Sequence, residues 1–245
     1  MFIRIKKMKL SRLYVNCYGK GNPTVVFESG LGCTHFDWKV VQNQISKDTR
    51  TFSYDRAGLG NSDKGDLPRT SLDQVHELHT ALNKAKVKAP YIIVAHSIGG
   101  YNARLFAGTY PEEVSGIIFV DCSHENQFED RLKRSSVNEI EVVKSQLIGE
   151  EQTFDELLIS AKQVKEIRKK DALRNIPIII LTADHKGEES AAISEEIWLN
   201  YQNDLVTLSD YSKHIIVEDC GHYIQKDKPQ VVIDAIKEIV NGMSK

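Results

Sequence analysis

Short apolar runs, separated by segments of helical periodicity, constrain the fold of this chain more than any other feature. Four of the six runs are almost entirely apolar, which is typical of strands that are covered on both faces. The alternation predicts an α/β fold with a mostly parallel sheet and helices on both of its faces. The runs are Val25–Phe27, Thr51–Tyr54, Tyr91–Ala95, Ile117–Val120, Ile178–Leu181 and His214–Val217.

The first 18 residues follow a different pattern, in which apolar and polar residues alternate more loosely. This alternation predicts an antiparallel hairpin at one edge of the sheet, with its turn near Lys7–Lys9. The apolar positions are Phe2, Ile3 and Ile5 on the first strand and Leu13, Val15 and Cys17 on the second.

Four segments between the runs carry apolar residues at helical spacing. Thr70 and Asp73 are spaced as a helix N-terminal cap, and Pro111 follows the end of another helix. The predicted helices are Trp38–Lys47, a helix of about 70–82, Ile98–Tyr110 and Pro229–Val240.

One long segment, Ser123–Asn175, interrupts the alternation, because it is strongly charged and contains no β run. Its apolar residues recur at helical spacing, and a structureless loop of this length is uncommon in a compact domain. We therefore expect a single domain over residues 1–245, with 123–175 as an inserted helical segment over the sheet.

The composition excludes several classes of protein. Hydrophobic residues make up 41% of the chain, charged residues 27%, and the formal net charge is −2, so neither a disordered chain nor a basic nucleic-acid-binding face is expected. No apolar run approaches the roughly 18 residues of a membrane-spanning helix. The basic N-terminal decapeptide lacks the apolar core of a signal peptide.

The cysteines and histidines give no sign of a metal site. Cys17, Cys33, Cys122 and Cys220 form no CxxC pair, so we expect reduced thiols and a cytoplasmic location. His76 and His79 are three residues apart on a predicted helix, a spacing that could suit a ligand pair, but they lie away from the candidate site described below. We expect neither a metal nor a cofactor.

A candidate nucleophile follows the third apolar run. Ala95-His96-Ser97-Ile98-Gly99 passes directly from a predicted strand into a predicted helix, with small residues two positions before and two after the serine. A serine at such a sharp turn exposes its hydroxyl, and the N-terminus of the following helix favours developing negative charge. The alternative is a serine that merely caps this helix.

A serine hydroxyl needs a base to become a nucleophile. His222 follows the last apolar run and precedes the final helix, so it lies on the same edge of the sheet as Ser97. Gly221 allows the loop to bend back, and we therefore predict that His222 is the base.

These features resemble the α/β-hydrolase superfamily of esterases and related enzymes, over nearly the whole chain. Phe27–Gly32 is similar to the family's HG oxyanion loop, with Ser29 in place of histidine. Tyr54–Ser62 is similar to its DRPGxGxS turn, with Ala57 in place of proline. The resemblance implies a mostly parallel eight-stranded sheet with a helical cap after strand six, where 123–175 falls.

The resemblance also implies an oxyanion hole made of two backbone N–H groups, those of Leu31 and Ile98. It implies an architectural role for the Asp55–Ser62 turn, in which Asp55 and Arg56 look like a local charge pair that supports the loops. His35, Phe36 and Trp38 follow the oxyanion loop, and they either line an acyl pocket or pack against the cap.

Two aspartates at strand ends could orient His222. The commonest family pattern places the acid nine residues beyond a proline before strand seven; from Pro177 that position is Lys186, and Asp184 lies two residues earlier. Other branches, including haloalkane dehalogenases, place the acid after strand six, about 24 residues beyond the nucleophile. Asp121 fits that spacing from Ser97, so we predict the triad Ser97, Asp121 and His222.

Such a triad catalyses acyl transfer, and the resemblance implies hydrolysis of small or medium carboxylic esters by way of an acyl-enzyme. A serine at the turn argues against dehalogenase and epoxide hydrolase chemistry, which use an aspartate there. Lactonase and thioesterase variants remain open. So does a ligand receptor on the same fold, with the charged cap as its docking surface. We expect a small-molecule substrate and no nucleic-acid partner; the oligomeric state is not predicted.

Overall fold

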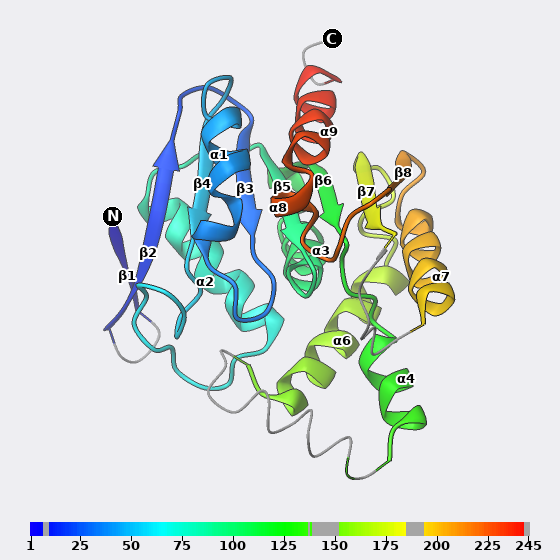
Figure 1. Ribbon diagram of the computed structural model, residues 1–245. Coiled ribbons are helices and arrows are strands. Elements are labelled where there is room, and N and C mark those ends of the chain that lie inside the picture. The colour runs from blue at the N-terminus through cyan, green and yellow to red at the C-terminus, as the bar shows by residue number, and fades with distance from the viewer. Residues whose placement is uncertain (7–9, 137, 139–151, 185–193, 243–245) are drawn as a thin grey trace.

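An eight-stranded sheet forms the centre of the molecule in the computed structural model, which describes residues 1–6, 10–136, 138, 152–184 and 194–242 (Figure 1). The strand order is β1-β2-β4-β3-β5-β6-β7-β8; β1 and β2 run antiparallel to their neighbours and the other strands are parallel. The predicted fold class is thereby confirmed. The strands are β1 (Phe2–Lys6), β2 (Leu10–Tyr18), β3 (Thr24–Glu28), β4 (Thr51–Tyr54), β5 (Tyr91–His96), β6 (Val114–Val120), β7 (Ile178–Ala183) and β8 (Ser212–Val217).

The continuous apolar runs are explained by two cores, one on each face of the sheet. Because successive side chains of a strand point to opposite faces, Val25 and Phe27 join one core and Val26 joins the other. The first core is closed by η1 (His35–Trp38), α1 (Lys39–Ile45), α8 (Ile224–Asp227) and α9 (Pro229–Gly242). The second is closed by α2 (Ser71–Lys84), α3 (Gly99–Thr109) and α6 (Phe154–Lys169).

The predicted helix cap and the predicted N-terminal hairpin are both present in the structure. Thr70 caps α2, with its side chain accepting from the Asp73 N–H while the Asp73 carboxylate accepts from the Thr70 N–H. β1 pairs antiparallel with β2, with Ile3 opposite Leu13, and the predicted turn at 7–9 lies outside the described residues. No helix in the described part of the chain combines the length and apolar character that a membrane crossing requires.

The predicted insertion contains two described helices, α4 (Gln127–Arg134) and α6, which lie beyond the carboxyl end of β6 in Figure 1. α6 also buries Leu157, Ala161 and Val164 against the core that α2 and α3 share, so its inner face belongs to the main domain. Residues 137 and 139–151 of the insertion lie outside the described part.

The short elements η1 and α8 were not predicted from the sequence, and neither were η2 (Pro111–Glu113), α7 (Glu195–Leu205) and η3 (Val206–Leu208). α7 lies between β7 and β8 in the chain and contacts β7. Its position matters for the site, because it brings a tryptophan to the end of β6.

Candidate active site

Ser97 occupies a sharp turn between β5 and α3. Its φ angle is +54°, in the left-handed region that non-glycine residues rarely adopt, and such strain is concentrated at functional sites. The turn is also tightly packed: a Cβ atom on Gly99 would lie 2.7 Å from the carbonyl oxygen of Ser29. Only a residue without a side chain fits at Gly99, which explains the small residue that the motif requires there.

The loop after β3, residues 29–32, lies directly against this turn. A Cβ on Gly30 would lie 2.7 Å from His96 Nδ1 and 3.4 Å from Ser97 Cβ. Within the described part of the chain, neither the Leu31 N–H nor the Ile98 N–H donates a hydrogen bond to another group. Two backbone donors beside the serine are therefore available to a ligand.

A buried arginine holds the 29–32 loop in place. Arg56 donates to the carbonyl oxygens of Ser29, at 2.6 Å, and of Gly30. Its charge is balanced by Glu28, whose Oε1 lies 2.7 Å from Arg56 Nη1, and both side chains are almost completely buried. This arrangement fixes the two carbonyl groups that precede the Leu31 N–H.

The neighbouring Asp55 supports a different loop, which corrects the expectation of a simple Asp55–Arg56 charge pair. Asp55 Oδ1 accepts from the His35 backbone N–H at 2.9 Å and lies 2.6 Å from His35 Nδ1. Trp38 is also buried and donates its indole N–H to Ser29 Oγ at 3.1 Å. His35 and Trp38 are therefore packing residues, whereas Phe36 is 62% exposed.

His222 and Asp121 meet at the carboxyl edge of the sheet. His222 Nδ1 lies 2.7 Å from Asp121 Oδ2. Asp121 is completely buried, and its other oxygen accepts from the Ala183 N–H at 3.1 Å and from the Trp198 indole at 2.9 Å. A carboxylate on this side places the imidazole proton on Nδ1, so Nε2 is the nitrogen that can accept a proton.

The alternative acid, Asp184, has a different set of partners. Its carboxylate accepts from the backbone N–H groups of Asp219, at 3.0 Å, and Cys220, at 3.2 Å. These residues lead into His222, so Asp184 stabilises the turn that carries the histidine.

His96 connects the serine turn to the histidine loop. Its Nε2–H donates to the His222 carbonyl oxygen at 2.9 Å, and the two rings lie 4.6 Å apart. Burial, together with the nearby His222, lowers the pKa of His96 to about 3. A neutral His96 can hold the His222 backbone beside Ser97 without adding a second positive charge.

This buried histidine predicts an acid-dependent loss of stability. The folded protein keeps His96 neutral down to about pH 3, whereas an unfolded histidine takes up a proton near pH 6.5. Falling pH therefore favours the unfolded chain, by up to about 1.4 kcal/mol per pH unit from this one group between pH 6 and 4. Urea unfolding at several pH values should show a shallower loss for His96→Gln than for the parent. His76→Gln, on an exposed position of α2, is the control, and equal slopes in all three proteins would contradict the assignment.

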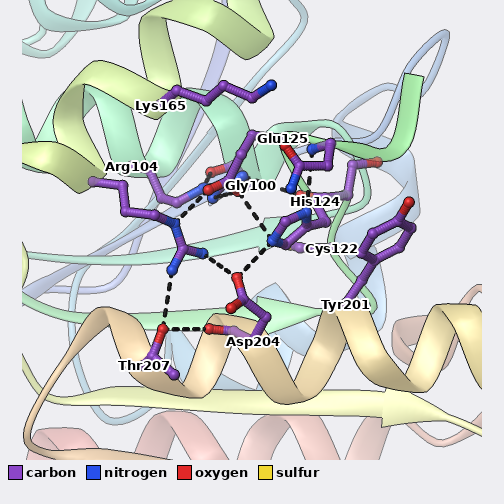
Figure 2. A network of polar contacts seen from close by, with 12 residues as sticks. Gly100, Arg104, Cys122, His124, Glu125, Lys165, Tyr201, Asp204 and Thr207 are labelled. Atoms are coloured by element: carbon purple, nitrogen blue, oxygen red, sulfur yellow. Dashed lines mark hydrogen bonds and ion pairs between the residues drawn. The ribbon is translucent and has the colours of Figure 1, made fainter. Parts of the chain in front are cut away.

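One group of residues brings potential metal ligands together. The ligand atoms of His124, Glu125 and Asp204 lie within 4.8 Å of one another (Figure 2). Arg104 Nη1 lies 2.5 Å from one Glu125 oxygen, and Arg168 pairs with the other oxygen and with Asp204. The two guanidinium groups already supply the positive charge that a cation would bring, so the group is explained as an ion-pair network.

Sequence reasoning missed several residues that shape this site. Glu28 and His96 could have been recognised from the sequence as candidate site residues, since each is a polar residue at the end of an apolar run. Trp198 could not, because its helix follows a stretch without apolar periodicity.

A family model described as alpha/beta hydrolase fold matches residues 23–175. The uncharacterized protein YqjL of Bacillus subtilis is 30% identical over 227 residues, which cover 90% of this chain and 85% of YqjL. Other curated relatives are longer, and the chain spans 16% to 64% of their length.

Solved structures share the fold at low sequence identity. A thermophilic esterase from Thermogutta terrifontis superimposes with a TM-score of 0.70 at 17% identity, covering 99% of this chain and 98% of the esterase. An enol-lactonase from Burkholderia xenovorans gives a TM-score of 0.65 at 14% identity, covering 94% and 97% of the two chains.

Proposed function

Since this chain belongs to the alpha/beta hydrolase fold family, we propose that it is a serine hydrolase that cleaves small or medium carboxylic esters. Ser97 is the nucleophile in this proposal, His222 the general base and Asp121 the acid that orients it. The N–H groups of Leu31 and Ile98 form the oxyanion hole. The observation that carries the proposal is the 2.7 Å contact of His222 with Asp121. The loop of His222 is in turn hydrogen-bonded to His96, the residue that directly precedes Ser97.

The first half of the reaction uses the tautomer that Asp121 imposes. His222 Nε2 takes the proton of the Ser97 hydroxyl as Oγ attacks the ester carbonyl carbon. The N–H groups of Leu31 and Ile98 stabilise the negative charge that develops on the carbonyl oxygen by donating hydrogen bonds to it. The N-terminus of α3 points at the same position and adds to this stabilisation. When the C–O bond breaks, His222 returns the proton to the alcohol that leaves, and the acyl group stays on Ser97.

The second half reverses the roles of the same groups. His222 Nε2 takes a proton from a water molecule, whose oxygen attacks the acyl carbon. The oxyanion hole stabilises the second tetrahedral intermediate as it did the first. His222 then returns the proton to Ser97 Oγ, and the carboxylic acid is released.

A substrate panel tests the proposed reaction class. p-Nitrophenyl acetate, butyrate and octanoate cover acyl chain length, and a simple lactone and a thioester cover the related acyl donors. We expect multiple turnovers with at least the shorter esters. Slow single-turnover labelling, with no product release, would instead favour a receptor on this fold.

We also propose that the 123–175 segment acts as a cap that selects substrate size, and Phe128 on α4 tests this. Phe128 packs edge-on against Phe154 of α6 and against Tyr101, four residues after Ser97, at ring-centroid distances of 6.0 and 6.4 Å. Phe128→Ala should change the ratio of octanoate to acetate turnover about 10-fold while acetate turnover changes less, because a longer acyl chain would meet the cap. Ile159→Ala, at a 46% exposed position of α6, is the control. An unchanged ratio in Phe128→Ala would contradict the role of the cap.

The cytoplasmic location expected from the sequence belongs to the same proposal. All four cysteines occur as free thiols, and burial raises the pKa of Cys122 and Cys220 above the usual range. Such thiols are stable in a reducing compartment.

A further inference from the structure

Helix α7 presents one face to the end of β6, where Asp121 lies. Trp198, Tyr201, Gln202 and Leu205 follow the spacing of a single helical face, and three of them are buried. Trp198 donates its indole N–H to Asp121 Oδ1 at 2.9 Å, and Gln202 donates to the Cys122 carbonyl oxygen at 2.8 Å. Residues one turn apart on α7 therefore hold consecutive residues after β6.

The indole acts on the Asp121 oxygen that does not face His222. The donors to this buried carboxylate include the Ala183 N–H and the Trp198 indole on Oδ1, and His222 Nδ1 on Oδ2. The two donors on Oδ1 determine the plane of the carboxylate, and this plane points Oδ2 at the imidazole. Without the indole, the carboxylate would lose a hydrogen bond that burial makes costly to break.

We propose that Trp198 is a positioning residue for the triad, acting through Asp121, and that a partly buried ion network holds its helix in place. The proposal rests on the proposed function, because Asp121 must be the acid that orients His222. Trp198 is not assigned a contact with the substrate; its role is to maintain the direction of the Asp121 carboxylate.

The network in Figure 2 anchors the C-terminal half of α7. Asp204 Oδ2 lies 2.7 Å from His124 Nε2 and 2.8 Å from Arg168 Nη2 of α6. The His124 ring stacks on Tyr201, with centroids 4.7 Å apart and planes 7° apart. α7 is thus tied both to the segment after Asp121 and to α6.

The tautomer of His124 is determined by its neighbours. Its Nδ1 accepts from the Asn126 N–H at 3.1 Å, so the neutral ring carries its proton on Nε2 and donates it to Asp204. Burial lowers the pKa of His124, which favours this neutral form. Every polar atom of the ring therefore has a partner, and the ring makes a well-defined support for α7.

A double-mutant cycle separates a positioning role from a merely structural one. Trp198→Phe keeps an aromatic ring but removes the N–H donor. We expect it to lower kcat for p-nitrophenyl acetate about 10-fold, with KM changed less than about two-fold. In the Asp121→Asn background, the same substitution should change kcat less than about two-fold, because the group through which it acts is already altered.

Trp38→Phe is the matched control, because it removes an indole N–H that donates to Ser29 Oγ instead. Its effect should be the same in both backgrounds. Equal losses for Trp198→Phe in the two backgrounds, or a change in KM alone, would overturn the positioning role while leaving the proposed function intact. An Asp121→Asn protein as active as the parent would overturn both the positioning role and the assignment of Asp121 as the triad acid, whereas a parent that turns over none of the esters would overturn the proposed function itself.

Indole NMR resonances give a readout that does not depend on turnover. The chain has two tryptophans, so the Trp198 N–H signal is the one that disappears in Trp198→Phe. Asp121→Asn should move this signal and leave that of Trp38 in place. A Trp198 signal that does not respond to Asp121→Asn would overturn the proposal.

Discussion

Replacing Ser97 by alanine is expected to lower kcat for ester hydrolysis by ~10⁴-fold or more, because the substitution removes the nucleophile while the oxyanion hole remains. The fold should be retained, since the hydroxyl lies on a half-exposed turn and alanine is smaller than serine. Initial rates with p-nitrophenyl butyrate, together with circular dichroism and thermal unfolding, measure both properties.

Ser46→Ala is the control for this comparison, because Ser46 caps the end of α1 and its hydroxyl donates only to the nearby Asn43 carbonyl. It should behave like the parent. If Ser97→Ala stayed within about tenfold of the parent, Ser97 would not be the nucleophile.

The second large effect is expected at the acid. Asp121→Asn should lower kcat by about 10²–10⁴-fold, because an amide in place of the carboxylate favours the wrong imidazole tautomer. Asp184→Asn should cost less than about tenfold, since Asp184 accepts from the backbone N–H groups of Asp219 and Cys220 and would affect His222 only through its loop. The pair of variants is measured with the same ester and checked for folding.

The two aspartates provide controls for one another, as both lie at the carboxyl ends of neighbouring strands. A large loss in Asp184→Asn with a small loss in Asp121→Asn would reverse the assignment. Similar losses in both would indicate that the two carboxylates act as one network.

The strands and the serine turn could be predicted because their signals are local. A run such as Tyr91–Ala95 is apolar at every position because each face of the sheet has its own core. The turn at Ser97 requires small residues within two positions, so the packing constraint can be recognised from the residues next to the serine in the sequence. The family resemblance, through the spacing from Ser97 that some of its branches show, also pointed to Asp121, the carboxylate that lies 2.7 Å from His222.

Contacts between distant segments could not be predicted in the same way. Arg56 pairs with Glu28 across neighbouring strands, whereas the sequence suggested a pair with the adjacent Asp55. Trp198 and Asp121 are 77 residues apart in the chain, and no sequence pattern near either residue predicts their hydrogen bond. Trp38 follows the 29–32 loop and could have lined a pocket, yet it is buried in the core against Phe27.

Covalent labelling of the intact protein tests the central claim most directly. The parent is incubated with phenylmethylsulfonyl fluoride, digested and analysed by mass spectrometry, with and without a competing ester. The proposed triad predicts one adduct per chain, on Ser97, which the ester reduces and which Ser97→Ala lacks. Ester hydrolysis that continues in fully labelled or Ser97→Ala protein, or an adduct on another residue, would contradict it.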